Sequence, residues 1–229
     1  MTYYALILDS NGNGIGSATY VEEPTTYPLN QAACTQAQAQ NPSLWQVVNG
    51  VLVQSLSATQ DAQITTIKQG FVTATATIPF TINSVNYVMD AATSKQAADM
   101  AMVVAANNAI SHPVAWTAGA TVAQYAVQEV NGVFLFCLIG GTTGTTAPTP
   151  PTTFGATVTD NTVTWELYGR DLELVGGAYM TFTPQEILAI FLQVEVYIHL
   201  CKNQLQALLA QIMAATTVSA VEAIVWSNP

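Results

Sequence analysis

The sequence is short of charged side chains. Only 8% of its residues are Asp, Glu, Lys or Arg, against about 25% in ordinary soluble domains. The balance is acidic, with 14 carboxylates and 4 cations, too few cations to neutralise a phosphate backbone, so we expect no nucleic-acid partner. Disorder is excluded because half of the residues are hydrophobic. Thirty threonines and 33 alanines fill much of the remaining chain, which indicates a folded protein with few charges to keep a monomer soluble.

Long apolar runs are also missing. The longest candidates, residues 133–139 and 187–192, are far shorter than the roughly 18 residues that a membrane-spanning helix needs. Residues 1–8 are apolar but contain no basic residue, and Asp9 follows them at once, unlike a secretory signal peptide. We therefore expect no membrane insertion.

Cysteine and histidine are scarce. Cys34, Cys137 and Cys201 are widely separated and odd in number, and each lies in an apolar stretch. We interpret them as buried free thiols of a protein made in a reducing cytoplasm, with one disulfide or a metal-binding pair as the alternatives. His112 and His199 are far apart, and no third ligand accompanies them. The sequence thus predicts neither a metal site nor a cofactor.

Catalytic motifs are not recognisable. The chain has no Gly-x-Ser-x-Gly elbow, no phosphate-binding loop and no zinc-ligand spacing. Asp9 opens a segment that resembles the start of a calcium loop, but Tyr20 stands where the bidentate Glu is required, so we interpret the segment as a turn. Carboxylate groupings such as Glu22-Glu23 show no sign of a pair held across a cleft. We expect no enzyme and no catalytic residue.

The pattern of apolar residues predicts an α+β fold in three parts. Residues 1–56 form a β-rich attachment unit. Residues 57–115 with 178–229 form a domain of helices and a hairpin. Residues 116–177 are inserted into that domain as a small all-β module. Asn49-Gly50 and Asn131-Gly132 each lie between apolar runs, and Asn-Gly supplies the two positive φ angles of a type I′ hairpin turn. Further hairpins are predicted over residues 3–21, 80–89 and 157–165, the last with its turn at Asp160-Asn161, and helices over residues 31–40, 57–74 and 91–109.

The last predicted helix is the longest. Thr183-Pro184-Gln185-Glu186 forms a capping box with proline in the first turn, and the helix extends over residues 184–215. Apolar residues follow it at alternating steps of four and three, which is the seam of a left-handed coiled coil. We predict that this seam is the oligomer interface; its residues are Ile187, Phe191, Val194, Ile198, Cys201, Leu205, Leu208 and Ile212. The alternative is intramolecular, a bundle in which this helix packs against the two earlier ones.

Aromatic residues of the inserted module are candidates for ligand contacts. Trp116, Tyr125 and Trp165 have apolar ring faces of the kind that stack on sugar rings. The alternative is that so small a module needs these rings for its own core. The sequence leaves both interpretations open.

Several segments resemble bacteriophage proteins. Residues 58–112 joined to 178–229 resemble an uncharacterised domain family of tail-fibre and tail-associated proteins of tailed phages. The matching features are the hairpin Phe80–Tyr87 leading to Asp90, the alanine-rich helix after it, and the Thr-Pro-Gln-Glu-Ile helix with His199, the Ala-Ala-Thr-Thr segment and Trp226. The insert, with its Gly-rich stretch 140–144 and the hairpin ending at Trp165, resembles small β modules of phage fibres and sugar-binding proteins. Residues 3–9 and the hairpin 45–53 resemble the heads of small tail-fibre accessory proteins.

The resemblance implies a virion protein of the tail or baseplate, made in the host cytoplasm. It implies a short tail fibre or a fibre-attachment component, with other tail proteins and further copies of itself as partners, in a homotrimer because fibres are usually trimers. Two alternatives remain open: a receptor-binding protein that recognises a host-surface glycan through the inserted module, and a chaperone of tail-fibre assembly.

Overall fold

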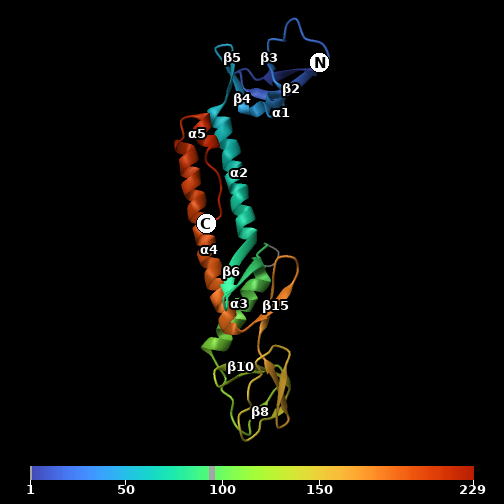
Figure 1. Ribbon diagram of the computed structural model, residues 1–229, viewed down its shortest axis with the longest axis vertical. Helices are drawn as coiled ribbons and strands as arrows, with labels where there is room; N and C mark the ends of the chain where they lie inside the picture. The colour runs from blue at the N-terminus through green and yellow to red at the C-terminus, as the bar shows by residue number, and fades with distance from the viewer. Residues whose placement is uncertain (1, 93–95) are drawn as a thin grey trace. The chain divides into compact units, whose positions relative to one another are not determined.

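The computed structural model describes residues 2–92 and 96–229, and its fold is mixed α+β, as predicted (Figure 1). The chain forms two compact units, one of residues 1–72 and 201–229 and the other of residues 73–200. Its helices are α1 (Gln36–Gln40), the 3-10 turn η1 (Pro42–Leu44), α2 (Leu56–Ala76), α3 (Gln96–Ser111), α4 (Pro184–Ala214) and α5 (Val218–Glu222). The long helices α2 and α4 therefore each contribute residues to both units.

The first unit begins with small antiparallel sheets. Strands β1 (Tyr3–Leu8), β2 (Gly14–Tyr20) and β3 (Gln31–Cys34) form a sheet in the order β2-β1-β3, and β4 (Trp45–Val48) pairs with β5 (Val51–Gln54). The turn between β4 and β5 has φ of 53° at Asn49 and 78° at Gly50, which confirms the predicted Asn-Gly hairpin.

Helix α2 packs against the C-terminal part of α4 and against α5 in this unit. Ile67, Ile212 and Val221 form the buried centre of the contact. Trp226 closes the cluster, with its ring edge-to-face with Phe71 at a centroid distance of 6.2 Å. The side-chain amide of Gln60 links α2 to the C-terminal end of α4. Its Nε2 donates to the carbonyl oxygens of Ile212 at 2.9 Å and of Ala215 at 3.2 Å.

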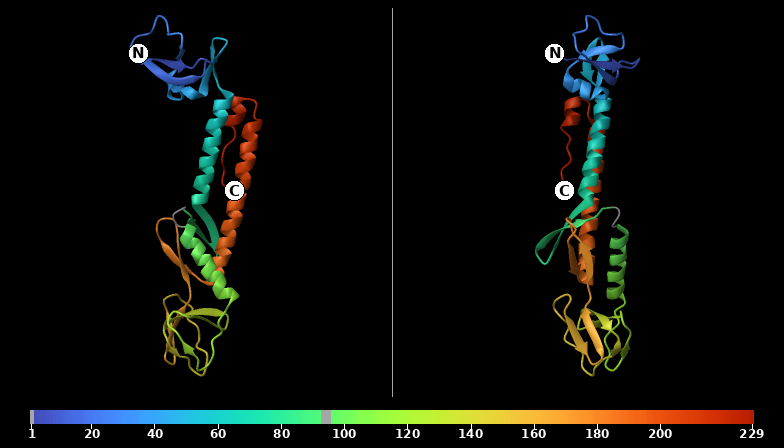
Figure 2. Two further views of the ribbon diagram at one scale, coloured as in Figure 1. Left: turned by 180° about the vertical axis from the view of Figure 1, so that it is seen from behind. Right: turned by 90° about the vertical axis from the view of Figure 1, so that its right-hand side faces the viewer.

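Outside the inserted module, the second unit consists of α3, the N-terminal part of α4 and two hairpins. The hairpins are β6 (Thr77–Ile82) with β7 (Val85–Asp90), and β14 (Arg170–Glu173) with β15 (Tyr179–Phe182). In the right-hand view of Figure 2, α3 and the β6–β7 hairpin lie on opposite sides of this part of α4. All of these elements supply one core, of which the largest members are Ile78, Phe80, Met89, Leu172, Phe182, Ile187 and Ile190. Phe80 stacks on Tyr87 at 5.3 Å, and Phe182 meets both rings edge-on.

The inserted module has a core of its own within the second unit. A four-stranded antiparallel sheet has the order β12-β13-β10-β9, and a short pair β8–β11 lies beside it. The strands are β8 (Thr121–Val122), β9 (Val127–Val130), β10 (Val133–Ile139), β11 (Gly141–Thr142), β12 (Thr157–Asp160) and β13 (Val163–Leu167). One sheet face buries Leu135, Cys137, Val163 and Trp165, as expected from alternation along a strand.

Several local predictions are confirmed. Thr183 caps α4: its Oγ1 accepts from the Glu186 backbone N–H at 3.3 Å, and the Glu186 carboxylate accepts from the Thr183 backbone N–H at 2.9 Å. The Asn131-Gly132 turn has φ of 53° and 81°. In the β6–β7 turn, Asn83 and Ser84 both have positive φ.

Other local predictions are wrong or shifted. Residues 31–34 form strand β3 rather than the start of a helix, because they pair with β1. The last hairpin of the module turns at Asn161-Thr162, since Asp160 belongs to β12 and pairs with Val163. The helix predicted over residues 57–74 is α2 and begins at Leu56, and its cap is Ser55, whose Oγ accepts from the Ala58 backbone N–H at 3.4 Å. The predicted helix 91–109 is α3 from Gln96 onward, and its positions 93–95 lie outside the described residues.

The predicted coiled-coil seam of α4 is the buried face of the helix. Ile187 and Val194 belong to the second unit's core, against which Phe191 and Ile198 pack. Ile212 is buried in the first unit's helical cluster, against which Leu205 and Leu208 pack, and Cys201 has no exposed surface. Ile187, Val194, Cys201 and Ile212 are covered by their own chain, so this part of the seam belongs to the monomer core. Phe191, Ile198, Leu205 and Leu208 are only half-buried, and an oligomer interface at the seam stays a prediction. α2 and α3 pack on different segments of α4 rather than in one three-helix bundle.

Candidate functional site

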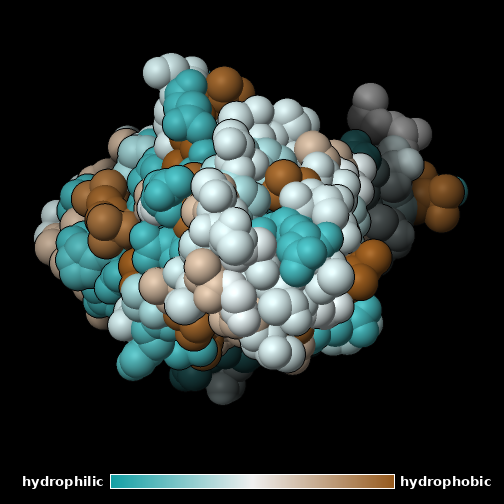
Figure 3. All heavy atoms as spheres, turned by 90° about the horizontal axis from the view of Figure 1, so that it is seen from below, coloured by the Kyte–Doolittle hydropathy of each residue, from teal (hydrophilic) through white to brown (hydrophobic). Residues whose placement is uncertain are grey.

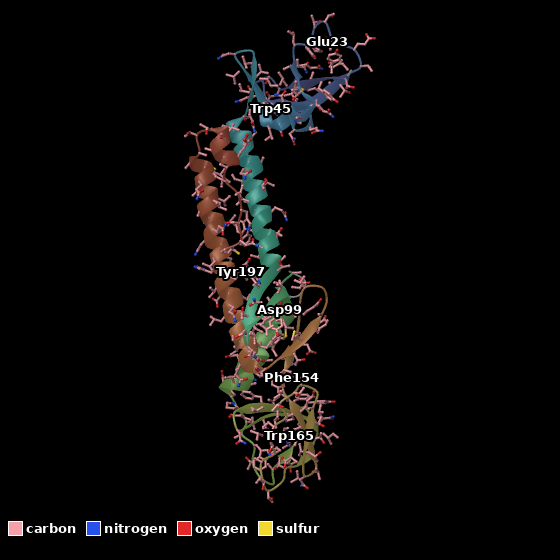
Figure 4. All side chains as sticks on the ribbon, viewed as in Figure 1. Glu23, Trp45, Asp99, Phe154, Trp165 and Tyr197 are labelled. Atoms are coloured by element: carbon pink, nitrogen blue, oxygen red, sulfur yellow. The ribbon has the colours of Figure 1, made fainter. Side chains whose placement is uncertain are left out.

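Two of the predicted ligand-contact residues serve the core of the inserted module. Trp165 has no exposed surface, and Figure 4 shows it inside the module. Trp116 is half-buried and packs against the same core. Both indoles donate to one carboxylate oxygen of Asp160, over 2.8 Å from Trp116 and 3.3 Å from Trp165. The prediction that Trp165 stacks on a sugar is therefore corrected, since no ligand reaches a ring that is fully enclosed.

Asp160 is the centre of this polar cluster. Its side chain is 95% buried, and its second carboxylate oxygen accepts from the Gly144 backbone N–H at 2.6 Å. Three N–H donors thus satisfy one buried carboxylate, which is the condition under which a charge is tolerated in a protein interior. The Gly-rich stretch predicted to be a loop is held to the sheet through this contact. Asp160 is accordingly structural.

Tyr125 is the third predicted residue, and it is exposed. Two thirds of its surface is accessible, and its backbone has φ of 70°, in the left-handed region. Its ring stacks on Phe136 at a centroid distance of 5.9 Å, and Phe136 stacks in turn on Tyr168 at 6.2 Å. The result is a row of three nearly parallel rings on the sheet face opposite the Trp165 core.

Arg170 extends this row. Its guanidinium lies 5.3 Å from the centre of the Tyr168 ring, and its Nε donates to the Tyr168 hydroxyl at 3.2 Å. A cation above an aromatic face is attracted by the electrons of the ring. Among the described residues no carboxylate pairs with Arg170, so its remaining N–H groups are available to a ligand.

A groove of about 490 Å³ opens beside these residues. It is lined by residues of β10 and β13, of the loop before β12, and of both strands of the β14–β15 hairpin: Phe136, Phe154, Gly155, Glu166, Leu167, Tyr168, Gly169, Arg170, Asp171 and Thr181. It combines apolar rings with charged groups of both signs. Neither Phe136 nor Tyr168 was among the predicted ligand contacts, but the alternation of β10 was a usable signal, since Leu135 and Cys137 face the core and leave Phe136 on the other side.

The cysteines and the Asp9 turn show no ligand chemistry. None of the three cysteines forms a disulfide within the described residues; Cys137 and Cys201 are buried and Cys34 is half-buried, and burial raises the pKa of Cys34 and Cys137. The Asp9 carboxylate accepts from Asn13 Nδ2 at 2.9 Å and from the backbone N–H groups of Asn11 and Asn13, both at 2.8 Å, so it closes its own turn. These hydrogen bonds, first that of the Asn13 side chain, lower the Asp9 pKa.

Within residues 2–92 and 96–229, no three His, Cys, Asp or Glu side chains come together as a metal site would require. None of the helices in these ranges combines the length and apolarity needed to cross a bilayer.

No protein-family model, no curated protein and no solved structure matches this chain.

Proposed function

We propose that the chain is a structural component of a bacteriophage tail or baseplate, either a short tail fibre or the component that attaches one. The resemblance of residues 58–112 and 178–229 to a tail-associated domain family supports this proposal. So does the composition, since a threonine- and alanine-rich chain with 8% charged residues is suited to contacts with neighbours. On the face shown in Figure 3, residues of near-neutral hydropathy predominate and hydrophobic ones are scattered among them.

The observation that carries the proposal is an apolar stripe on the outer face of α4. Leu192, Val196 and Leu200 are exposed by 63%, 52% and 47%. Their spacing of four residues places them in one line along the helix, away from the buried seam. Covering such a stripe removes apolar surface from water and favours association by roughly 25 cal/mol per Å². We propose that copies of the chain associate through this face rather than through the seam.

A second apolar surface lies on α3 in the same unit. Met100 and Val104 are exposed one helical turn apart and line a shallow groove with Ala101, Asn108 and His112. Polar amides and a histidine at the edge of an apolar surface are typical of contacts between different proteins. We assign this surface to a neighbouring tail protein.

Light scattering of the purified chain tests self-association. The proposal expects a mass that is a multiple of 24.3 kDa, with three copies as the number that the resemblance implies. Val196→Lys places a charge in the stripe and is expected to give monomers. Val51→Lys is the matched control, because Val51 is at least as exposed as Val196 but lies at the β4–β5 turn, and it is expected to leave the oligomer intact. A wild-type chain that remains a 24.3 kDa monomer at high concentration contradicts the proposal.

A further inference from the structure

The groove beside Phe136 has the size and composition of a small-ligand site. Its volume of about 490 Å³ falls within the roughly 300–1,000 Å³ of such sites. It lies on the outer face of the module's sheet, where the chain passes from β13 into β14. Trp116 and Trp165 are absent from its lining, and so is Tyr125, which stacks on Phe136 but does not line the groove. It is therefore a different site from the one that the sequence suggested.

Aromatic rings form the apolar part of the groove. Phe136 and Phe154 are half-buried, so each retains accessible ring surface. Figure 4 labels Phe154, which reaches the groove from the loop before β12. Gly169 makes its approach possible, because a Cβ at that position would lie 2.5 Å from the Phe154 ring. An aromatic surface of this kind binds the C–H face of a ring-shaped ligand.

The polar groups of the groove include both acceptors and donors. Glu166 is half-buried and pairs in register with Phe136, and its carboxylate accepts no hydrogen bond from any described residue. Arg170 is held by Tyr168 and forms no ion pair among these residues. Asp171 accepts from the Thr181 hydroxyl at 2.6 Å and keeps its other carboxylate oxygen. The Glu166 carboxylate therefore has acceptor capacity left for a ligand that donates hydrogen bonds.

We infer that this groove binds a neutral saccharide. A pyranose offers an apolar C–H face to the rings of Phe136 and Phe154, and its hydroxyl groups both donate, to Glu166 and Asp171, and accept, from Arg170. An anionic ligand is disfavoured because two carboxylates face it. A neutral ligand that both donates and accepts hydrogen bonds matches a lining that holds two carboxylates and one guanidinium. The inference goes beyond the structural role, because a component that only joins other proteins has no need of such a site.

Titration of the full chain with cellotriose, maltotriose and triacetylchitotriose tests the inference, followed by two-dimensional ¹H–¹⁵N NMR. At least one of the three is expected to shift the backbone signals of residues 166–171 saturably, with a Kd below about 10 mM. Glu166→Gln keeps the shape of the side chain but removes its charge, and it is expected to weaken binding about tenfold or more. Glu129→Gln is the matched control, because Glu129 lies on the same sheet outside the groove, and it is expected to change the Kd less than about twofold.

Every other outcome overturns the inference. No saturable shift with any of the three sugars, or equal weakening by both Glu→Gln variants, excludes a saccharide site at Glu166. Choline and inorganic phosphate are titrated as well. If either shifts the signals of residues 166–171 more strongly than the sugars do, the groove is a cation or an anion site and the saccharide inference is overturned. Phe154→Leu is the second variant, because it reduces the ring surface without touching a charge. It is expected to weaken binding, and unchanged binding in it overturns the inference that the sugar stacks on the aromatic surface of this groove. The oligomer mass is measured on the same samples, so failure of sugar binding is distinguished from failure of the structural proposal.

Discussion

The buried carboxylate of Asp160 is the interaction on which the inserted module should depend most. Asp160→Asn changes one atom of the side chain and preserves its size. The amide retains one acceptor oxygen, whereas Asp160 uses both oxygens, one for the two indole N–H groups and one for the Gly144 N–H. Whichever way the amide is oriented, its NH₂ group faces at least one donor. That donor is buried and left without a partner.

The magnitude follows from the three hydrogen bonds. A hydrogen bond to a charged group contributes about 1.5–3 kcal/mol and a neutral one about 0.5–1.5, so each retained bond loses about 1 kcal/mol. An unsatisfied buried donor costs about 1–3 kcal/mol more. Together these effects lower the free energy of unfolding of the module by about 3–5 kcal/mol.

Urea unfolding followed through the tryptophan indole signals by NMR measures this loss. The chain has four tryptophans, of which Trp116 and Trp165 contact Asp160 while Trp45 and Trp226 belong to the first unit. With an m-value of about 1–3 kcal/mol/M, the unfolding midpoint at Trp116 and Trp165 should fall by about 1 M or more. Trp45 and Trp226 should keep theirs.

Asp171→Asn provides the control, because within residues 2–92 and 96–229 that exposed carboxylate is bound only by the Thr181 hydroxyl. It should change the midpoint of the module by no more than the roughly 0.5 kcal/mol typical of surface substitutions. The reasoning is refuted if Asp160→Asn has as small an effect as Asp171→Asn. It is also refuted if the signals of Trp45 and Trp226 shift as far as those of Trp116 and Trp165.

Two further substitutions test the first unit. Gly70→Ala places a Cβ 2.6 Å from the Trp226 ring and should destabilise α2 by about 1–2 kcal/mol in thermal unfolding. In a Trp226→Ala background the ring is gone, and the same change should stabilise α2 by about 1 kcal/mol because alanine favours the helix more than glycine does. If this sign reversal is not seen, the packing of Trp226 on Gly70 is contradicted. Asn13→Ala removes the main cause of the lowered Asp9 pKa, so NMR titration of the carboxyl should show the pKa rising toward its ordinary value of 3.8. Because the pKa of Asp9 is lowered in the folded state, its carboxylate stabilises the fold at pH values above the ordinary pKa, and this stabilisation is lost as the pH falls through the lowered pKa. An unchanged Asp9 pKa in the variant rules out this role for Asn13.

Local signals in the sequence were sufficient where a short segment determines its own conformation. Asn49 and Asn131 precede glycines between apolar runs, and both turns form as predicted because positive φ is a property of the pair itself. The Thr183–Glu186 capping box is equally local. These features required no knowledge of distant residues.

Predictions failed where a distant residue decides. Residues 31–34 have good helix formers, yet they pair with β1 and form its neighbouring strand, because non-local pairing outweighs weak helix propensity. The turn predicted at Asp160-Asn161 moves by one residue, since Asp160 is held inside the sheet by Trp116 and Trp165. Neither contact leaves a signal in the neighbouring sequence.

The predicted seam of α4 is a further feature whose partner is decided by distant residues. Its heptad spacing identified the face that is buried, but periodicity does not distinguish a second copy of the chain from the chain's own elements. Ile187 meets hairpins in one unit and Ile212 meets α2 and α5 in the other. For the same reason, the sequence indicated aromatic residues in the module but not which of them face a groove, because Glu166 and Arg170 come together only through the sheet and the hairpin after it.

Mass spectrometry of purified virions tests the proposed function most directly. The proposal predicts peptides of this chain in finished particles, in a fixed ratio to other tail proteins and in the tail fraction after particles are dissociated. Absence of the chain from finished particles, with its presence in lysates of infected cells, contradicts the proposed structural role and favours the assembly-chaperone alternative.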